Sequence, residues 1–454
     1  MLKHKRSLEG VRLKKKKSGG VYCSPRWSGE ITDCSMPVTF DQYDHCSYNC
    51  LYCFSWFQKS LKTFNPLYKS TMGTQYQSEH VRHVSVKVLE DILTSKRETG
   101  RVGQFADYFR NRITMQWGGL CDPFDEYERK YGIGLECLKV LKKYNYPVCF
   151  STKATWWTED DRYLALFHNQ KNWNVKFSII NLDPEMARKI ECGCPTPEER
   201  LYAMESMNAI GCGGVTLRLR PFIIGMSNVD NQHIELIRRA ADCGASALST
   251  EFFCLEDRAH PGTVARYDKI SDALGYDIRE FYKRNSPGMH GYLRLNYKLK
   301  EQYVFEMRDE AHKQGMIFAI SDSHWKDLND TLSCCGLDDT KFRVAEGQYT
   351  ALVVKARRRW DAGERNVLVT WDMMEEHLQM YKKFKYIYAE GFNTVGTANR
   401  TKYWNDSMYD YLREIWNRPN NAKSPYKYFY GLMVPVKTDS RGNMVYRYKP
   451  YGVR

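Results

Sequence analysis

The sequence predicts an α/β fold: a partial (β/α)6 barrel of the TIM type that stays open, followed by a basic, aromatic-rich C-terminal extension. Short β-like runs alternate with amphipathic helical runs over residues 37–336, which is the pattern of a parallel sheet. Polar and apolar side chains alternate with period two inside several of these runs. The chain has 454 residues, enough for one large core and an accessory domain. We therefore expect a barrel over residues 37–336 and an accessory region over residues 337–454.

The expected strands begin directly before a cysteine-rich segment. They lie at residues 38–40, 113–117, 148–153, 175–180, 215–220, 245–251 and 316–321. Between them, apolar residues recur at helical spacing near residues 81–98, 133–141, 197–210, 234–241 and 304–311. The clearest helix start is Thr196, which forms a capping box with Glu199 and precedes a proline at the first helical position.

The alternation within the strands predicts a polar barrel interior. In the third strand Val148 and Phe150 face one way, whereas Cys149, Ser151 and Lys153 face the other. The fourth, fifth and sixth strands separate their side chains in the same manner. Because helices must cover the apolar faces, we expect the polar faces to point into the barrel. A polar face solvated in an open sheet is the alternative.

The composition is that of a soluble globular protein, with 43% hydrophobic and 27% charged residues. No apolar run approaches the roughly 20 residues that cross a bilayer, and the N-terminus lacks the apolar centre of a signal peptide. We therefore expect a cytoplasmic protein without a membrane partner. Fifteen cysteines in a reducing compartment favour a metal cofactor and unpaired thiols over a disulfide framework.

The net charge of +14 and the pI near 9.0 imply an acidic partner, with nucleic acid as the first candidate. Residues 1–36 are expected to form a basic arm and an irregular lead-in, and the arm either contacts phosphate or is a solvated tail. In the C-terminal region, Lys355–Trp360 is a basic cluster, and residues 425–450 predict a hairpin. Residues 401–454 hold ten Lys or Arg, four Asp or Glu and nine Tyr. This mixture suits phosphate neutralisation with base stacking, or a small cap whose tyrosines pack on the barrel.

The most informative segment holds Cys46, Cys50 and Cys53. Three thiols within eight residues can turn towards one point as metal ligands. A [4Fe–4S] cluster with three cysteine ligands keeps one iron open, and that iron can chelate S-adenosylmethionine (SAM). The alternative is a zinc site. The remaining zinc ligands would come from Cys23, Cys34, His45, Cys192, Cys194, Cys334 or Cys335. If Cys334 and Cys335 do not bind zinc, they form a redox pair or only pack in the core.

The cysteine spacing, with Tyr52 before the last cysteine, resembles the signature of the radical SAM superfamily. The resemblance implies a [4Fe–4S] cluster, reduced by a protein such as flavodoxin or ferredoxin, that cleaves SAM to a 5′-deoxyadenosyl radical. It also implies that Tyr52 lies beside the adenine.

Further segments resemble the spore photoproduct lyase-like branch of that superfamily over about residues 38–255. They are Gly118-Gly119 through Asp122-Pro123 with Glu128, Phe150–Lys153, Phe177-Ser178, Ile190–Pro195 with Glu198–Leu201, and Arg220–Gly225. The resemblance implies that Gly118 and Gly119 hold the SAM amino group through their backbone, that Lys153 pairs with the SAM carboxylate, and that Ser178 contacts the ribose or the methionine part.

For three further residues the sequence leaves two kinds of role open. Arg218 and Arg220 are expected to bind the SAM carboxylate or a substrate phosphate, or else to pair with Glu191 or Glu251. Cys121 lies near the position of the hydrogen-donor cysteine of the lyase, so it is either a catalytic thiol or a buried inert one.

The expected function is that of a radical SAM enzyme acting on a nucleic-acid base, in DNA repair or modification of the lyase type. A base inside a duplex would have to be flipped out or already unpaired. Radical modification of RNA, of a peptide or of a small metabolite is the alternative among enzymes. A zinc-stabilised nucleic-acid-binding protein without catalysis is the alternative of another class.

Overall fold

The computed structural model describes most of the 454 residues. The described residues are 12–15, 25–28, 32–44, 46–55, 80–94, 96, 103, 105–257, 259, 261–287, 292–383 and 407–450. Cys23, His45 and most of the expected basic arm lie outside them. Among the described residues, no helix combines the length and the apolar character that a membrane span requires.

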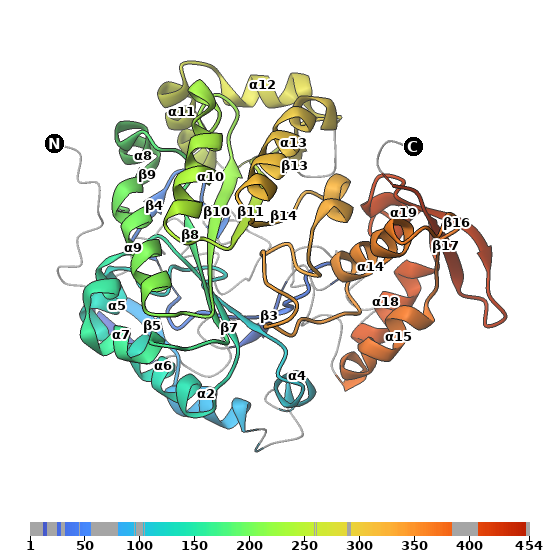
Figure 1. Cartoon of the computed structure of the whole chain (residues 1–454), viewed down its shortest axis with the longest axis horizontal. Helices are drawn as coiled ribbons and strands as arrows, with labels where there is room; N and C mark the ends of the chain where they lie inside the picture. Colours follow the sequence, from blue (N-terminus) through green and yellow to red (C-terminus); the bar gives the residue numbers. More distant parts are fainter. Residues whose placement is uncertain are drawn as a thin grey trace. The chain divides into compact units, whose positions relative to one another are not determined.

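An eight-stranded sheet runs through the molecule in the order β14-β11-β10-β8-β7-β6-β3-β2 (Figure 1). Its strands are β2 (Arg26–Trp27), β3 (Val38–Phe40), β6 (Met115–Trp117), β7 (Val148–Thr152), β8 (Trp173–Ser178), β10 (Gly214–Phe222), β11 (Ala247–Phe252) and β14 (Ile317–Ile320). The central strands β7, β8, β10 and β11 pair in parallel, whereas β2 pairs antiparallel with β3 at the edge of the sheet. The predicted α/β class with a mainly parallel, open sheet is therefore confirmed.

Helices connect the strands of this sheet. They are α5 (Glu126–Tyr131), α6 (Ile133–Lys143), α7 (Asp161–Phe167), α8 (Pro184–Ile190), α9 (Pro197–Ala209), α10 (Gln232–Asp242), α11 (Pro261–Leu274), α12 (Ile278–Asn285) and α13 (Tyr297–Lys313), with the short helices η3 (Trp156–Glu159) and η4 (Val229–Asn231). Helix α9 packs on β8 and β10, and α13 packs on β11 (Figure 1). The predicted capping box is present, because Thr196 accepts from Glu199 N and the Glu199 carboxylate accepts from Thr196 N.

The strand register confirms the predicted separation of faces. Ser151 pairs with Lys176, and Ser178 pairs with Arg218, so these polar side chains share one face. On the opposite face, the Phe150 ring lies 5.3 Å from that of Phe167 in α7, centroid to centroid. The apolar face of the sheet is thus the face that helices cover, as period-two alternation requires.

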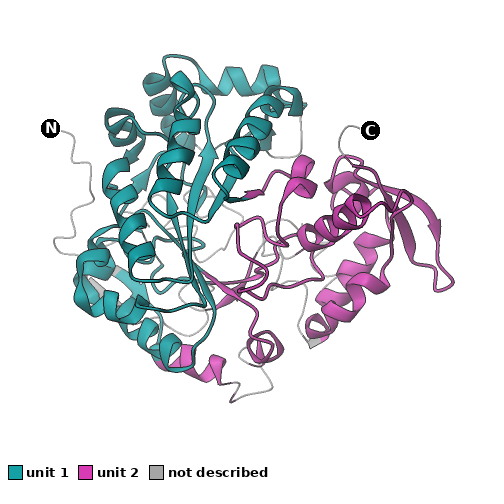
Figure 2. Cartoon of the chain, in the orientation of Figure 1, with its two compact units in different colours: residues 1–24, 40–86, 117–317 teal, residues 25–39, 87–116, 318–454 magenta. Residues whose placement is uncertain are grey.

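The chain divides into two compact units (Figure 2). Unit 1 comprises residues 1–24, 40–86 and 117–317, and unit 2 comprises residues 25–39, 87–116 and 318–454. Unit 1 also holds the small strands β1 (Arg12–Lys15), β4 (Asn49–Cys50), β5 (His80–His83), β9 (Glu191–Cys192), β12 (Cys254–Glu256) and β13 (Tyr292–Arg294). Strand β1 pairs in parallel with β5, so four residues of the expected basic arm form a strand. The sequence does not predict this pairing, because the arm has no apolar period.

Unit 2 consists mainly of the C-terminal region. Besides β2 and most of β3, β6 and β14, it holds α2 (Val86–Leu93, of which only Val86 belongs to unit 1), α4 (Ala106–Arg110), η5 (Ser323–Leu328), α14 (Tyr349–Asp361), α15 (Asp372–Leu378), η6 (Gln379–Lys383), α18 (Met408–Trp416), α19 (Pro425–Tyr428) and the sheet of β15 (Leu368–Val369), β17 (Met444–Tyr448) and β16 (Met433–Thr438). Strands β16 and β17 form the predicted hairpin. A buried ion pair joins Lys326 and Asp33, and Thr350 bonds to both of these side chains. The pair Cys334 and Cys335 is buried in this unit.

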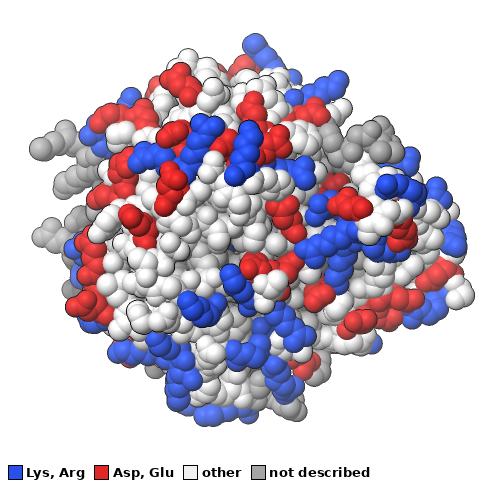
Figure 3. Space-filling view, in the orientation of Figure 1, with Lys and Arg blue, Asp and Glu red and all other residues white. Residues whose placement is uncertain are grey.

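The basic cluster of α14 is compensated by carboxylates. Its four basic residues pair as Lys355–Glu346, Arg357–Asp361, Arg358–Asp339 and Arg359–Glu364, with N···O distances of 2.7, 3.3, 2.8 and 2.6 Å. On the face drawn in Figure 3, acidic side chains also lie among the basic ones. The cluster is therefore a weaker candidate for phosphate binding than its sequence suggests.

Candidate functional site

The cysteine loop, residues 46–53, follows strand β3 and is held by a short ladder. Strand β4 pairs antiparallel with β9, so Cys50 lies opposite Glu191. Leu51 N continues the ladder to Ile190 O at 2.8 Å, and Cys53 N closes a turn onto Cys50 O at 3.1 Å. The loop is thereby fixed against the segment that follows helix α8.

Two side chains anchor the loop from other elements. Asp125, the N-cap of α5, accepts from Ser47 N at 2.5 Å. Arg266 in α11 donates to the Asn49 side-chain oxygen at 2.9 Å and to Cys50 O at 2.8 Å. Burial raises the pKa of Asp125 to about 8, and the Ser47 N–H opposes this rise because it favours the charged carboxylate.

The thiols of the loop have different surroundings. Cys50 Sγ lies 3.5 Å from Cys194 Sγ, and this hydrogen bond lowers the pKa of Cys50, against the effect of burial. Burial raises the pKa of the Cys46 thiol, and the carboxylates of Asp125 and Asp122 raise it further. Among the residues that the structure describes, none of the loop cysteines is in a disulfide, and no three His, Cys, Asp or Glu side chains already form a metal-binding group.

Lys153 and Tyr52 lie beside Cys50. Lys153 follows β7, its backbone N donates to Asp122 at 2.6 Å, and its ammonium lies 5.5 Å from the centroid of the Tyr52 ring. Burial lowers the pKa of Lys153, but the charges of Cys50, Glu191 and Cys194 raise it by more, so the net shift is upward. Lys153 therefore stays protonated in a site rich in potential anions.

A buried ion pair between Arg200 and Glu191 supports the cysteine loop. Arg200 Nη1 lies 2.5 Å from Glu191 Oε2, and both side chains are 1% exposed. Arg200 also donates to Ser178 O at 2.7 Å and to Pro195 O at 2.6 Å. Tyr52 donates its hydroxyl to Glu191, so the ion pair connects the cysteine loop to β8 and to the start of α9.

The glycine turn after β6 is sterically required. Gly118 has a φ of +89°, and a Cβ there would lie 2.6 Å from Ser151 O. Its N–H donates to Phe40 O at 3.0 Å. Beyond Gly119, the Asp41 carboxylate accepts from the N–H groups of Leu120 and Cys121, at 2.9 Å each. Gly118 thus brings the turn against the ends of β3 and β7.

Glu128, part of the resemblance to the lyase branch, has a structural role here. Its carboxylate accepts from Tyr163 Oη at 2.6 Å, Tyr43 Oη at 2.9 Å, Gly134 N at 2.7 Å and Leu135 N at 2.8 Å. The donors from α6 and α7 bind these helices to α5, and Gln42 Nε2 also donates to the carboxylate at 3.5 Å. Asp122 is similarly engaged, because it accepts from Thr152 Oγ1 at 2.7 Å.

The remaining predicted residues lie on neighbouring strands or turns. Ser178 ends β8 and accepts from Arg218 Nη1 at 3.2 Å. Arg220 forms an ion pair with Glu251, which is one of the two outcomes left open from the sequence. Cys121 is buried and its thiol donates to Tyr43 O at 3.3 Å. A hydrogen-donor role for Cys121 stays a prediction.

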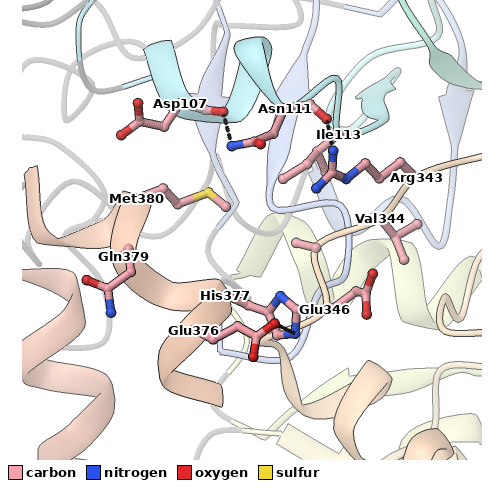
Figure 4. Close-up of a pocket in the computed structure, with 11 residues that line it drawn as sticks. Asp107, Asn111, Ile113, Arg343, Val344, Glu346, Glu376, His377, Gln379 and Met380 are labelled. Atoms are coloured by element: carbon pink, nitrogen blue, oxygen red, sulfur yellow. Dashed lines mark hydrogen bonds and ion pairs between the residues drawn. The ribbon is translucent and has the colours of Figure 1, made fainter. Parts of the chain in front are cut away.

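A cavity of about 230 Å³ in unit 2 contains none of the predicted site residues (Figure 4). Asn111 Nδ2 donates to Asp107 O at 2.8 Å, and Arg343 donates to Asn111 O at 3.0 Å on its wall. His377 lies 3.8 Å from Glu376 on the opposite wall. Burial lowers the pKa of His377, with Lys355 acting in the same direction, so this wall carries a neutral imidazole near pH 7.

Glu256 offers a test of pH dependence. It is 7% exposed, and both carboxyl oxygens lack a hydrogen-bond partner within the described part of the chain. Burial raises its pKa from 4.5 to about 7. The neutral carboxyl therefore stabilises the fold fully below about pH 4.5, and that contribution is lost as the pH rises through 7.

Replacing Glu256 by glutamine is expected to flatten the decline of stability between about pH 5 and pH 8. The free energy of unfolding, measured by urea titration at several pH values, checks this. The exposed Glu235→Gln is the matched control and should keep the wild-type profile. A Glu256→Gln profile parallel to that of the wild type would show that this carboxyl does not titrate between the two states.

Reasoning from the sequence missed two supports of the site. Arg266 is 216 residues from Cys50, and no spacing rule connects them. The sequence suggests Cys194 only as a distant ligand of a zinc site, whereas its thiol lies beside Cys50. Its position depends on the pairing of β4 with β9, two-residue strands that are too short to give a periodic signal.

No family model matches the chain. It is 27% identical over 244 residues to an uncharacterized protein of Mycobacterium tuberculosis (strain ATCC 25618 / H37Rv) and equally to one of Mycobacterium bovis. Each match covers 51% of this chain and 66% of the relative, just under two thirds of its length.

Several solved structures are similar to this chain. A spore photoproduct lyase complexed with dinucleoside spore photoproduct has a TM-score of 0.46 at 15% identity and covers 68% of this chain and 82% of its own. A mutant of the same lyase has a TM-score of 0.48 at 14% identity with the same coverage. Streptococcus suis SuiB bound to the precursor peptide SuiA has a TM-score of 0.37 at 13% identity and covers 65% and 51%. At these identities the likeness concerns the fold alone.

Proposed function

We propose that this protein is a radical SAM enzyme whose cysteine loop binds a [4Fe–4S] cluster. One observation carries the proposal. The loop with Cys46, Cys50 and Cys53 is anchored beside the ends of β6 and β7, where Gly118 and Lys153 follow their strands. Active sites of parallel α/β sheets are built from the loops at these carboxyl ends.

The residues present fit such a cluster. Thiolates are the ligands that iron–sulfur clusters use, and the Cys50 thiol is already biased towards its thiolate by Cys194 and Lys153. On neighbouring strands of the sheet, Ser151 Oγ in β7 and the side-chain oxygen and nitrogen of Asn181, shortly after β8, are buried without a hydrogen-bond partner in the part of the chain described. Buried polar atoms of this kind are normally satisfied, so they favour a polar ligand at this edge of the sheet.

When bound, the cluster supplies the electron that cleaves the sulfonium of SAM to methionine and a 5′-deoxyadenosyl radical. The chain itself contributes binding and orientation. Lys153 is a cation placed to receive the SAM carboxylate, and the Tyr52 ring lies under it. Gly118 lets the backbone approach a ligand closely because it has no Cβ.

Lys153→Ala is expected to weaken SAM binding about tenfold or more while the iron content stays unchanged, because it removes a charge-assisted hydrogen bond and no metal ligand. Equilibrium dialysis of SAM against the reconstituted protein, together with iron analysis, checks this. Lys139→Ala on the exposed face of α6 is the control. Unchanged SAM affinity, or loss of iron in Lys153→Ala, would contradict the assignment.

For the substrate we propose a nucleic-acid base, in DNA repair or modification. The net charge of +14 supports an acidic polymer. The paired arginines of α14 do not add to this support. The test is the release of 5′-deoxyadenosine by the reconstituted, reduced protein with single-stranded DNA, duplex DNA, RNA or no polymer. Stimulation by DNA alone supports the proposal, and equal release in all arms points to a peptide or small metabolite.

A mononuclear zinc site in a nucleic-acid-binding protein is the second candidate. The observation that favours it is the 3.5 Å distance between Cys50 Sγ and Cys194 Sγ. Two thiolates on one tetrahedral zinc with bonds of about 2.3 Å lie about 3.8 Å apart. Metal analysis separates the candidates: a brown anaerobic preparation with about four irons per chain supports the enzyme, whereas one zinc in a colourless preparation supports the binding protein.

A further inference from the structure

A second thiol lies against that of Cys50. The Sγ atoms of Cys50 and Cys194 are 3.5 Å apart, and neither cysteine is in a disulfide. Cys50 is buried, whereas Cys194 is partly exposed. Cys192, only two residues before Cys194, instead donates its thiol to Lys189 O at 3.4 Å. Of the two cysteines in the segment after α8, Cys194 is thus the one whose thiol meets Cys50.

The backbone brings these two thiols together from adjacent strands. Cys50 lies opposite Glu191 in the antiparallel pair of β4 with β9. After β9 the chain turns tightly, because Gly193 has a φ of +85° and Cys194 N donates to Glu191 O at 3.0 Å. The contact between the sulfurs therefore follows from strand pairing and from a turn that only a few residue types favour.

Arginine side chains anchor the backbone on both sides of the contact. Arg266 donates to Cys50 O at 2.8 Å, and Arg200 donates twice to Pro195 O, next to Cys194, at 2.6 and 2.9 Å. A disulfide bond is about 2.05 Å long, so the two sulfurs have to approach by about 1.5 Å to form one. We expect rotation about the two Cα–Cβ bonds to supply this movement while the anchored backbone stays in place.

We propose that Cys50 and Cys194 are a redox modification site: in molecules without a metal they form a reversible disulfide, which keeps Cys50 from binding iron. The bond itself is inferred from the geometry alone. Its effect on iron rests on the proposed function, in which Cys50 is a cluster ligand. Iron–sulfur clusters bind thiolates, and a sulfur held in a disulfide is not a thiolate.

The oxidant is a low-molecular-weight disulfide such as oxidised glutathione. One thiolate of the pair attacks a glutathione sulfur, which breaks the glutathione S–S bond, forms a mixed disulfide and releases one glutathione thiolate. The second thiolate attacks the protein sulfur of the mixed disulfide and releases the other glutathione. The two protein thiols thus lose two protons and two electrons, which leave with two molecules of reduced glutathione. Excess reduced glutathione reverses both steps.

The bond is tested on the full chain, prepared anaerobically without metal as wild type, Cys194→Ala and Cys192→Ala. Each protein is equilibrated with mixtures of reduced and oxidised glutathione, and free thiols are alkylated before the protein is unfolded. We expect the wild type and Cys192→Ala to form a crosslink between the Cys50 peptide and the peptide of residues 190–200. Cys194→Ala should not form it.

The digest has to separate the three cysteines of the loop. Chymotrypsin cuts after Tyr48 and Tyr52, so Cys50 lies on a different peptide from Cys46 and Cys53 in the mass spectrum. The dependence on glutathione is a second readout. A disulfide within the protein responds to the square of the reduced glutathione concentration, whereas a mixed disulfide responds to its first power.

The effect on the metal is measured by cluster transfer from a loaded iron–sulfur scaffold protein, with no free sulfide or thiol present. The oxidised wild type, freed of glutathione, is expected to acquire about a tenth or less of the iron that the reduced wild type acquires. Treatment with a phosphine reductant should restore the uptake. Oxidised and reduced Cys192→Ala should repeat the wild-type difference.

The outcomes separate this inference from the proposed function. A Cys50 that is fully alkylated even in oxidised glutathione alone, or that crosslinks to Cys46 or Cys53, overturns the disulfide and leaves the radical SAM function standing. A crosslink that forms without lowering the uptake of iron overturns the control of the metal. If the reduced wild type acquires no iron, the proposed function fails, while the crosslink map still decides whether the disulfide forms.

Discussion

Replacing Cys50 by alanine is expected to reduce the iron content of the reconstituted protein from about four atoms per chain to near zero and to abolish all cleavage of SAM. Cys50 is the loop thiol whose pKa is lowered, so its thiolate is the most readily available ligand. With two loop cysteines left, a cube would have to bind through a set of ligands that the β4–β9 ladder does not position. Iron and sulfide analysis with the absorbance near 400 nm measures the first effect, and 5′-deoxyadenosine release measures the second.

The matched control for this substitution is Cys192→Ala. Cys192 lies in the strand that pairs with the loop, but its thiol bonds to Lys189 O rather than to the site. It should keep its iron and its activity. Iron retained by Cys50→Ala together with SAM cleavage would show that Cys50 is not a ligand and would remove the basis of the enzymatic proposal.

Arg200→Met is expected to lower the free energy of unfolding by about 3–5 kcal/mol, since it leaves Glu191 as an uncompensated buried charge. The cost is large because both partners are 1% exposed and water cannot replace the lost guanidinium. The substitution also removes the donors to Ser178 O and Pro195 O. Urea unfolding of the metal-free protein, followed by tryptophan fluorescence, measures the change.

Arg188→Met provides the control, because Arg188 forms an ion pair with Glu185 in which the two side chains are 58% and 61% exposed. A surface pair of this kind contributes about 0–1 kcal/mol. The double variant Arg200→Met with Glu191→Gln should recover part of the loss, because it removes the stranded charge. Equal effects of Arg200→Met and Arg188→Met would mean that the Glu191 carboxylate is hydrated when its partner is removed.

Seven of the eight strands of the large sheet, all except β2, were predictable because each leaves a local signal. Residues 38–40 match β3, and residues 148–153 match β7 to within one residue. Strand β10 is longer than predicted. It includes Pro221 and runs to Phe222, although proline usually ends a strand. Thr196 and Glu199 also acted locally, through a cap that depends on four consecutive residues.

The supports of the site were less predictable, because they join distant parts of the chain. Arg220 could have paired with either of two glutamates, and only the register of β10 with β11 brings it to Glu251. The basic cluster of α14 appeared to be available for phosphate, but its side chains pair with nearby carboxylates, of which Asp361 lies only one helical turn on and Asp339, the farthest, lies 19 residues before Arg358. Composition reports how many charges a chain has, but not which of them form pairs.

The anchoring of the cysteine loop by Arg266 limits how small a working version of this protein can be. The loop carbonyl at Cys50 and the amide of Asn49 depend on a guanidinium more than 200 positions downstream. A fragment that ends before helix α11 would keep every residue of the cysteine signature and yet lack the side chain that immobilises its backbone. Transplanting the eight-residue cysteine loop into another scaffold would meet the same difficulty, unless the recipient supplied an equivalent cation at that carbonyl.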